Sequence, residues 1–123
     1  MERNVTNRRS TVFRLTPNRN ATRSTLGKIF SRLDLVRRFD VLIDSSDVGV
    51  EKPDPRIFQL ALQRSGARAE TTLHAGDFFH VDVVGARAAG LQAWLIDAAG
   101  LYADHDVTRV PSLAALVDRL LAA

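Results

Sequence analysis

The sequence of 123 residues contains no cysteine, which excludes disulfide bonds, zinc–thiolate sites and cysteine nucleophiles. It has no apolar run of 18 or more residues, so we expect no transmembrane helix. The first 25 residues are polar and arginine-rich, with no apolar central stretch, so we expect no signal peptide. These absences suit a protein of the reducing cytoplasm, which is the predicted location.

Aromatic residues are also few, at 7%, whereas hydrophobic residues make up 46% and charged residues 25% of the chain. Such a composition is ordinary for a soluble globular domain, and the length fits one domain. We divide the chain into a polar, basic segment at residues 1–20, expected to be disordered, and a domain at residues 21–123.

Positive charge is concentrated near the N-terminus. Residues 1–38 hold ten Lys or Arg against two acids, a net charge of +8, and the remaining residues carry −5. A basic arm of this kind could bind nucleic acid. No aromatic residue stands among the arginines before Phe13, so a base-stacking surface is not visible and a solvated terminus is favoured.

Strand and helix patterns alternate along the chain, with short connections. This order predicts an α/β fold with a parallel sheet and helices on both of its faces. Ligands of such sheets bind beyond the carboxyl ends of the strands. The expected strands are Thr11–Leu15, Phe39–Asp44, Thr71–Ala75 and Gln92–Ile96; the expected helices are Thr22–Val36, a helix from Pro55 to Gly66, Val81–Ala89 and a helix after Ser112.

Polar residues follow two of these strands. Ser45 and Lys52 follow the second strand, and Gly76, Asp77 and Asp82 follow the third. Two carboxylates and a lysine at such an edge could bind a phosphate bridged by Mg²⁺, with Gly76 allowing close approach of the ligand. The alternatives are that the carboxylates cap the following helix and that the lysine is an ordinary surface residue.

The three histidines have separate expectations. His74 lies within a strand and is expected to be a hydrogen-bonded structural residue. His80 could face a bound phosphate, although a solvent-facing position is favoured. His105 lies in an acidic loop that could hold a metal, although a solvated turn is favoured for this composition.

The stretches VGVEKPDPRIF and GDFFHVD, the latter followed by GARAAG, resemble the third and fourth motifs of haloacid dehalogenase-superfamily hydrolases. The resemblance covers roughly residues 26–121 and implies a Rossmann-like core. It implies that Lys52 stabilises a phosphoenzyme and that Asp77 and Asp82 hold Mg²⁺. The Gly76-Asp77 pair favours a phosphatase over a true dehalogenase.

The family's first motif, an Asp-x-Asp at the end of the central first strand, has no match before the strand at Phe39–Asp44. The cap domain has no match either, and only Asp34 and Asp40 precede this region. Thr16 is assigned to the second motif, with Thr22 and Ser24 as alternatives. The central strand is therefore expected to be missing, and truncation is the favoured explanation.

Three functions follow in order of preference. The first is a Mg²⁺-dependent phosphohydrolase that acts on a small phosphorylated metabolite through an aspartyl-phosphate, inactive as this isolated chain. The second is a non-catalytic module that pairs through an exposed sheet edge, for example as a homodimer. The third is a nucleic-acid-associated protein that uses the basic segment.

Overall fold

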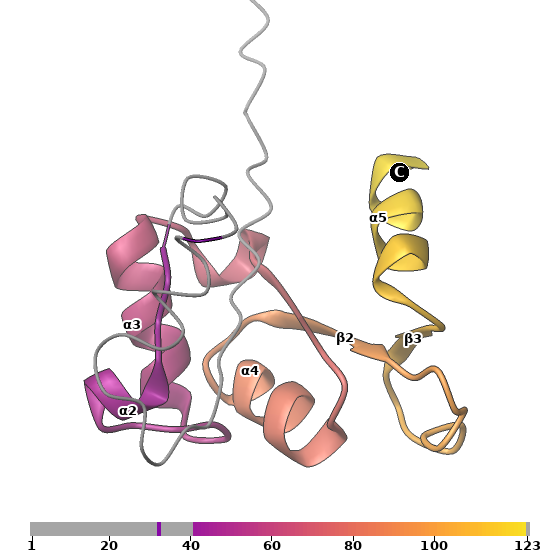
Figure 1. Cartoon of the computed structure of the whole chain (residues 1–123), viewed down its shortest axis with the longest axis horizontal. Coiled ribbons are helices and arrows are strands. Elements are labelled where there is room, and N and C mark those ends of the chain that lie inside the picture. The colour runs from indigo at the N-terminus through magenta and orange to yellow at the C-terminus, as the bar shows by residue number, and fades with distance from the viewer. Residues whose placement is uncertain (1–31, 33–40, 123) are drawn as a thin grey trace, which may run out of the picture.

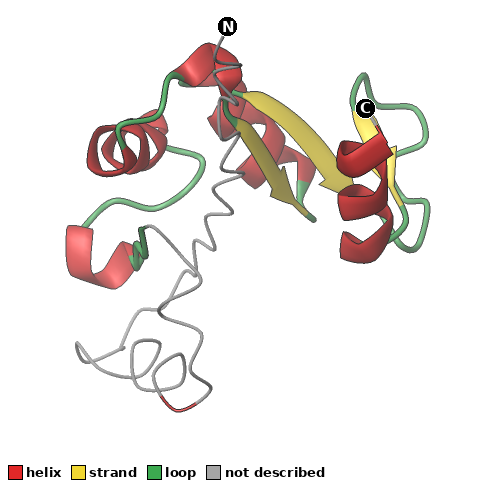
Figure 2. Cartoon of the chain, turned by 90° about the horizontal axis from the view of Figure 1, so that it is seen from above, coloured by secondary structure: helices red, strands yellow, loops and turns green. Residues whose placement is uncertain are grey.

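A parallel sheet of three strands forms the centre of the part of the chain that the structure describes. The structure is a computed structural model and describes residue 32 and residues 41–122. The strands are β1 (Leu73–Gly76), β2 (Gln92–Ile96) and β3 (Thr108–Val110), in the order β1-β2-β3. Gly76 pairs with Leu95, and Ile96 pairs with Val110, so the carboxyl ends of the strands share one edge of the sheet (Figure 2).

Helices cover both faces of the sheet, as the sequence predicts. Along β2, Ala93 and Leu95 are buried on the side of α3 and α4, whereas Trp94 points to the opposite side and lies under the guanidinium of Arg119 in α5, 4.8 Å from it. Figure 1 shows α3 beside α4, with α5 next to the far edge strand β3. The helical elements are α2 (Ser45–Val48), α3 (Pro55–Ser65), η2 (Ala69–Thr71), η3 (Phe79–Val83), α4 (Val84–Ala88) and α5 (Leu113–Ala122).

One hydrophobic core joins α3, α4 and β2. Its largest fully buried side chains include Phe58 and Ile57 from α3 and Leu95 from β2. Burial of these side chains stabilises the fold by about 1.5–3 kcal/mol each. The core residues are Ile43, Ile57, Phe58, Ala61, Val83, Ala86, Leu91, Ala93 and Leu95.

The sequence signals for α3 are confirmed at both of its ends. The side chain of Asp54 accepts a hydrogen bond from the backbone N–H of Arg56 at 2.9 Å, and Pro55 occupies the first turn, where no N–H is needed. Gly66 ends the helix in the left-handed conformation, with φ at 68°. The predicted strand Gln92–Ile96 is likewise confirmed as β2.

Other boundaries differ from the prediction. The expected strand Thr71–Ala75 begins at Leu73, because Ala69–Thr71 forms a 3₁₀ turn. The helix expected at Val81–Ala89 begins two residues earlier, as the π-helical turn η3, and continues as α4. The three-residue strand β3 was not predicted, because it owes its conformation to pairing with β2 and carries no pattern of its own.

The prediction of a strand at Phe39–Asp44 is wrong for residues 41–44, which have no regular secondary structure. The apolar pattern reported burial correctly, since Ile43 is buried, but within the described residues no strand pairs with this segment. A strand needs a hydrogen-bonded neighbour as well as an apolar face. The expected strand Thr11–Leu15 lies outside the described residues, as does the expected helix Thr22–Val36 apart from Arg32, which is helical.

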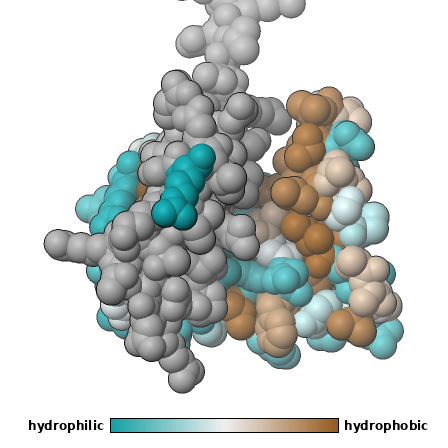
Figure 3. Space-filling view, viewed as in Figure 1, coloured by the Kyte–Doolittle hydropathy of each residue, from teal (hydrophilic) through white to brown (hydrophobic). Residues whose placement is uncertain are grey.

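Helix α5 carries an exposed apolar stripe. Leu113, Val117 and Leu121 are separated by one helical turn each and are 53%, 44% and 80% exposed, whereas Leu116 on the inner side is buried. Figure 3 shows this stripe as a column of hydrophobic residues. None of the helices within the described ranges is long and apolar enough to cross a membrane.

Gly85 allows α4 to lie close to the turn that contains Lys52. A Cβ at this position would stand 2.8 Å from both the carbonyl oxygen of Pro53 and the ring of Phe58. We expect Gly85→Ala to lower the free energy of unfolding by about 1–3 kcal/mol, because backbone must move to admit the methyl group. Chemical denaturation measures the change, and Ala88→Leu on the exposed side of α4 is the control, expected within about 0.5 kcal/mol of the wild type. Equal effects of both substitutions would contradict this account of the close approach.

Candidate functional site

The centre of the site is an ion pair between Lys52 and Asp82. Lys52 precedes α3 in a loop whose Lys52–Pro53 peptide bond is cis, and Asp82 lies in η3 after β1. The Nζ atom of Lys52 is 2.5 Å from Oδ1 of Asp82, and the two side chains are 12% and 3% exposed. The structure therefore brings together two predicted site residues that lie 30 positions apart in the sequence.

Asp82 accepts hydrogen bonds at both of its carboxylate oxygens. Oδ1 accepts from Lys52 and from Nε2 of His74 at 3.1 Å, and Oδ2 accepts from the backbone N–H groups of Asp77 and Phe78 at 3.1 and 3.0 Å. Burial opposes ionisation of this carboxyl, but the hydrogen bonds from His74, Lys52 and Phe78 outweigh it and hold the pKa of Asp82 far below its usual range. Asp82 is therefore a fixed buried anion that holds an ammonium group in place.

Gly76 makes room for this carboxylate. A Cβ on Gly76 would stand 2.1 Å from Cγ and 2.3 Å from Oδ2 of Asp82. The structure shows close approach of the Asp82 side chain to Gly76, and close approach of a ligand there remains a prediction. Glycine at the end of β1 is thus required for the position of the buried anion.

The carboxylate of Asp77 is in a different environment from that of Asp82. Asp77 is exposed, and within the described residues its side chain has no hydrogen-bond or ion-pair partner. The side chain of Asp77 does not cap the following helical turn, which begins after Phe78. Oδ2 of Asp82 accepts from the backbone N–H of Phe78, the residue before that turn, so the capping alternative is wrong for Asp77 only.

Oxygen ligands suit Mg²⁺, which is held in phosphate sites by one or two carboxylates together with water and phosphate oxygens. Asp77 fits that requirement as an accessible carboxylate, whereas the oxygens of Asp82 already accept four hydrogen bonds. Among the described residues, no three His, Asp or Glu side chains gather into a group that could hold a metal by themselves. The assignment of Asp77 and Asp82 to Mg²⁺ remains a prediction.

The remaining predicted site residues lie at different depths. Ser45 is buried at the start of α2, directly after Asp44, whose side chain accepts from the backbone N–H of Ser46 at 2.9 Å. His80 is exposed, and its ring contacts Phe79 edge-on with centroids 5.5 Å apart. Thr16 lies outside the described residues, so its assignment also remains a prediction.

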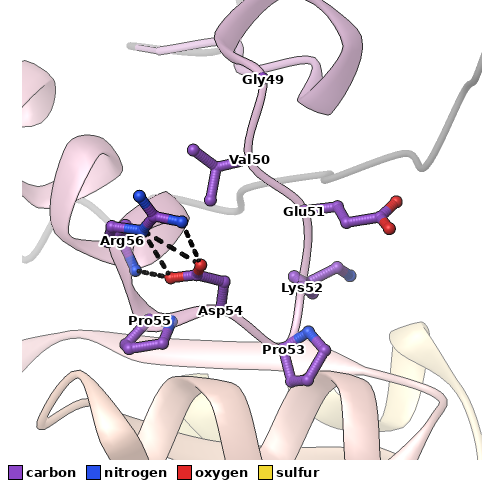
Figure 4. A pocket seen from close by; sticks show the side chains of 8 residues that line it. All are labelled: Gly49, Val50, Glu51, Lys52, Pro53, Asp54, Pro55 and Arg56. Carbon is purple, nitrogen blue, oxygen red and sulfur yellow. Dashed lines mark hydrogen bonds and ion pairs between the residues drawn. The ribbon is translucent and has the colours of Figure 1, made fainter.

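An open pocket lies on the loop that carries Lys52. It has a volume of about 630 Å³ and is lined, within the described residues, by Gly49–Arg56. Figure 4 shows Lys52 and Glu51 pointing to one side of this loop, while Arg56 pairs with Asp54 on the other. The hydrogen bonds from Arg56 lower the pKa of Asp54, and Asp54 in turn raises the pKa of Arg56. This pair stabilises the start of α3, where the Lys52 loop ends.

Another buried carboxylate, for which the sequence predicted no role, organises the loop after β2. Asp97 accepts from the backbone N–H groups of Leu101 and Tyr102 at 2.8 and 3.0 Å and pairs with Arg109 at 3.1 Å. Burial raises the pKa of Asp97, but these donors outweigh it and lower the pKa overall. The sequence signal for this role is that Asp97 directly follows the strand Gln92–Ile96.

The loop that Asp97 organises packs against η3 through aromatic rings. Phe79 lies 4.5 Å from His105 and 6.2 Å from Tyr102 between ring centroids. The expected solvated turn is confirmed for the loop, where Asp104 and Asp106 are exposed, but the His105 side chain is half-buried in this aromatic cluster. The cluster therefore packs Phe79 of η3, the turn that carries Asp82, against this loop.

A family model for haloacid dehalogenase-like hydrolases matches residues 10–90. Among curated proteins, a glyceraldehyde 3-phosphate phosphatase of Methanothermobacter thermautotrophicus is 39% identical over 75 residues, which are 61% of this chain and 33% of the relative. A phosphoserine phosphatase of Thermus thermophilus is 41% identical over 63 residues, 51% of this chain and 25% of the relative. The chain thus matches a third or less of the length of these two relatives.

Solved structures agree with the fold. A HAD phosphatase from Thermococcus onnurineus superposes with a TM-score of 0.68 at 27% identity, covering 79% of this chain and 46% of that one. A 2-haloacid dehalogenase from Pseudomonas syringae superposes with a TM-score of 0.73 at 28% identity, covering 91% of this chain and 46% of that one. The match of a family model to more than half of the residues, together with this fold, shows that the chain belongs to the haloacid dehalogenase-like hydrolases.

Proposed function

We propose that the chain provides the lysine and acidic part of a Mg²⁺-dependent phosphohydrolase site. The observation that carries the proposal is the buried Asp82 carboxylate, which holds the ammonium group of Lys52 at the same edge of the sheet as the accessible carboxylate of Asp77. A fixed cation beside a free carboxylate suits a phosphate that is also bound to a divalent cation. The substrate class is a small phosphorylated metabolite, in keeping with the phosphatases among the relatives.

In this proposal each residue has one task. Lys52 neutralises charge on the phosphate oxygens, because its ammonium is already oriented and part of its desolvation cost is paid on folding. Asp77 would hold Mg²⁺, which supplies charge neutralisation at the phosphoryl group when it is bound. Asp82 orients Lys52 and, through the backbone N–H groups of Asp77 and Phe78, shapes the loop that carries Asp77.

Hydrolysis through an aspartyl-phosphate also needs a nucleophilic carboxylate. The family resemblance places that group in an Asp-x-Asp motif, which has no match before Phe39–Asp44 in this sequence. We therefore expect the 123-residue chain to bind phosphate with Mg²⁺ but to turn over a phosphate ester negligibly. A cytoplasmic location, expected from the composition, is part of the same proposal.

Substitution of the accessible carboxylate tests the proposal. In calorimetric titration of the purified chain with inorganic phosphate in the presence of Mg²⁺, we expect Asp77→Asn to weaken binding at least tenfold, since a metal ligand is lost. Asp104→Asn, which removes another exposed carboxylate from a neighbouring loop, should bind as the wild type does. Wild-type protein that binds no phosphate with Mg²⁺, or equal binding by both variants, would refute the proposed function.

Turnover is measured in parallel on an aryl phosphate. Clear Mg²⁺-dependent hydrolysis that is lost in Asp77→Asn would support the site but contradict the expected inactivity, because an acid of this chain would then serve as the nucleophile. Pairing through an exposed sheet edge and nucleic-acid binding by the basic N-terminal segment stay predictions, and residues 1–20 lie outside the described residues.

A further inference from the structure

His74 is a second buried contact of the carboxylate that holds Lys52. It lies on β1 two residues before Gly76, and alternation along a strand places both residues on the same face. Asp82 packs over Gly76 on that face, so the imidazole of His74 meets its carboxylate, with Nε2 3.1 Å from Oδ1. His74 is only 2% exposed.

The chemistry of the pair determines which imidazole nitrogen carries the proton. Asp82 is ionised and can only accept, so Nε2 of His74 must donate. The other nitrogen, Nδ1, is buried and has no hydrogen-bond partner. An unpaired lone pair is less costly there than an unpaired buried N–H, which agrees with a proton on Nε2 of His74.

Simple packing does not explain a histidine at this position. The ring contacts Phe58 of α3 edge-on, with centroids 4.9 Å apart, and an apolar side chain could fill the same space. Such a residue would avoid the unpaired Nδ1. The property that histidine adds is the hydrogen bond to Oδ1 of Asp82, the same oxygen that accepts from Lys52.

We propose that His74 is a positioning residue that fixes the carboxylate of Asp82 and thereby the ammonium group of Lys52. A lysine side chain has four flexible carbons and cannot orient its own partner. The imidazole is rigid, buried and anchored on a strand, so it holds Oδ1 while two backbone N–H groups hold Oδ2. The functional meaning of this role rests on the proposed binding of phosphate by Lys52.

The reactivity of Lys52 tests the proposal without any ligand. The chain contains only two lysines, Lys28 and Lys52, so each measurement has an internal reference. In acetylation followed by mass spectrometry, we expect His74→Leu to raise the rate at Lys52 relative to Lys28 at least fivefold. His74→Gln should stay within about twofold of the wild type, because a glutamine amide can donate from nearly the same place as Nε2.

Controls separate positioning from general loss of stability. Leu116→Ala removes a buried side chain of α5, away from Asp82. It should lower the melting temperature without changing the ratio of the acetylation rates at Lys52 and Lys28. If His74→Leu fails to fold, His74→Asn replaces it, since its amide is too short to reach Oδ1. An unchanged ratio in His74→Leu or His74→Asn, an equal rise in His74→Gln, or an equal rise in Leu116→Ala would overturn the proposal.

Titration with inorganic phosphate and Mg²⁺ then distinguishes the two proposals. Weaker binding by His74→Leu, with recovery in His74→Gln, would support both. A changed acetylation ratio with no phosphate binding by the wild type would support the positioning role of His74 and refute the proposed function of the site.

Discussion

Replacement of Gly76 by alanine is expected to abolish phosphate binding and to lower the free energy of unfolding by about 1–3 kcal/mol. The new methyl carbon would overlap the carboxyl carbon of Asp82, 2.1 Å away, so the buried carboxylate would have to leave its position. Displacement would break the contacts to Lys52 and His74 together. Phosphate titration and chemical denaturation of the same sample measure both effects.

Gly66→Ala is the matched control for this substitution. Gly66 ends α3 with φ at 68°, and a Cβ there would meet no atom within 4 Å. Its replacement should cost about 1 kcal/mol through backbone strain alone and leave phosphate binding intact. Normal phosphate binding by Gly76→Ala would show that the position of Asp82 is not needed for the site.

Asp82→Asn is expected to destabilise the protein by about 3–5 kcal/mol, because Lys52 would become a largely buried charge without its partner. The double variant Lys52→Met/Asp82→Asn should recover much of this loss, since both charges are then removed. Chemical denaturation of the two single variants and the double variant measures the interaction energy between Lys52 and Asp82. Additive effects of the two substitutions would mean that the ion pair contributes no stability of its own.

The same carboxyl predicts how stability depends on pH. The pKa of Asp82 is lower in the folded protein than the value near 3.8 of an ordinary aspartate. Its stabilising contribution is therefore fully present above that ordinary value and is lost as pH falls below it toward the folded pKa. Below pH 4, wild-type stability should fall more steeply than that of Asp82→Asn in acid denaturation. Parallel curves for the two proteins would contradict the lowered pKa.

The site was predictable as a set of residues but not as a set of contacts. The motif around Lys52 and the motif from Gly76 to Asp82 identified the residues that now lie together. The different environments of the two carboxylates were not visible, because spacing alone treats Asp77 and Asp82 as equivalent ligands. The link from His74 to Asp82 was also missed, since it depends on which face of β1 each side chain occupies.

The predicted bounds of helices and strands were also accurate where local residues decide them and inaccurate where tertiary contacts do. Helix α3 and strand β2 were predicted closely because capping residues, proline and alternating apolar residues act locally. Strand β3 was missed and Val41–Asp44 was assigned wrongly, because pairing with a neighbouring strand decides both cases. A local apolar pattern indicates burial, but it does not indicate which other segment a strand pairs with.

The sequence by itself determined the α/β class, the family and the candidate site residues, because periodicity, caps and motifs are properties of neighbouring residues. Only the tertiary structure decided that Asp82 is a buried anion held by four donors while Asp77 stays accessible. The reason is that η3 turns one carboxylate inward over Gly76, and burial and hydrogen bonding then give two aspartates five residues apart different chemistry.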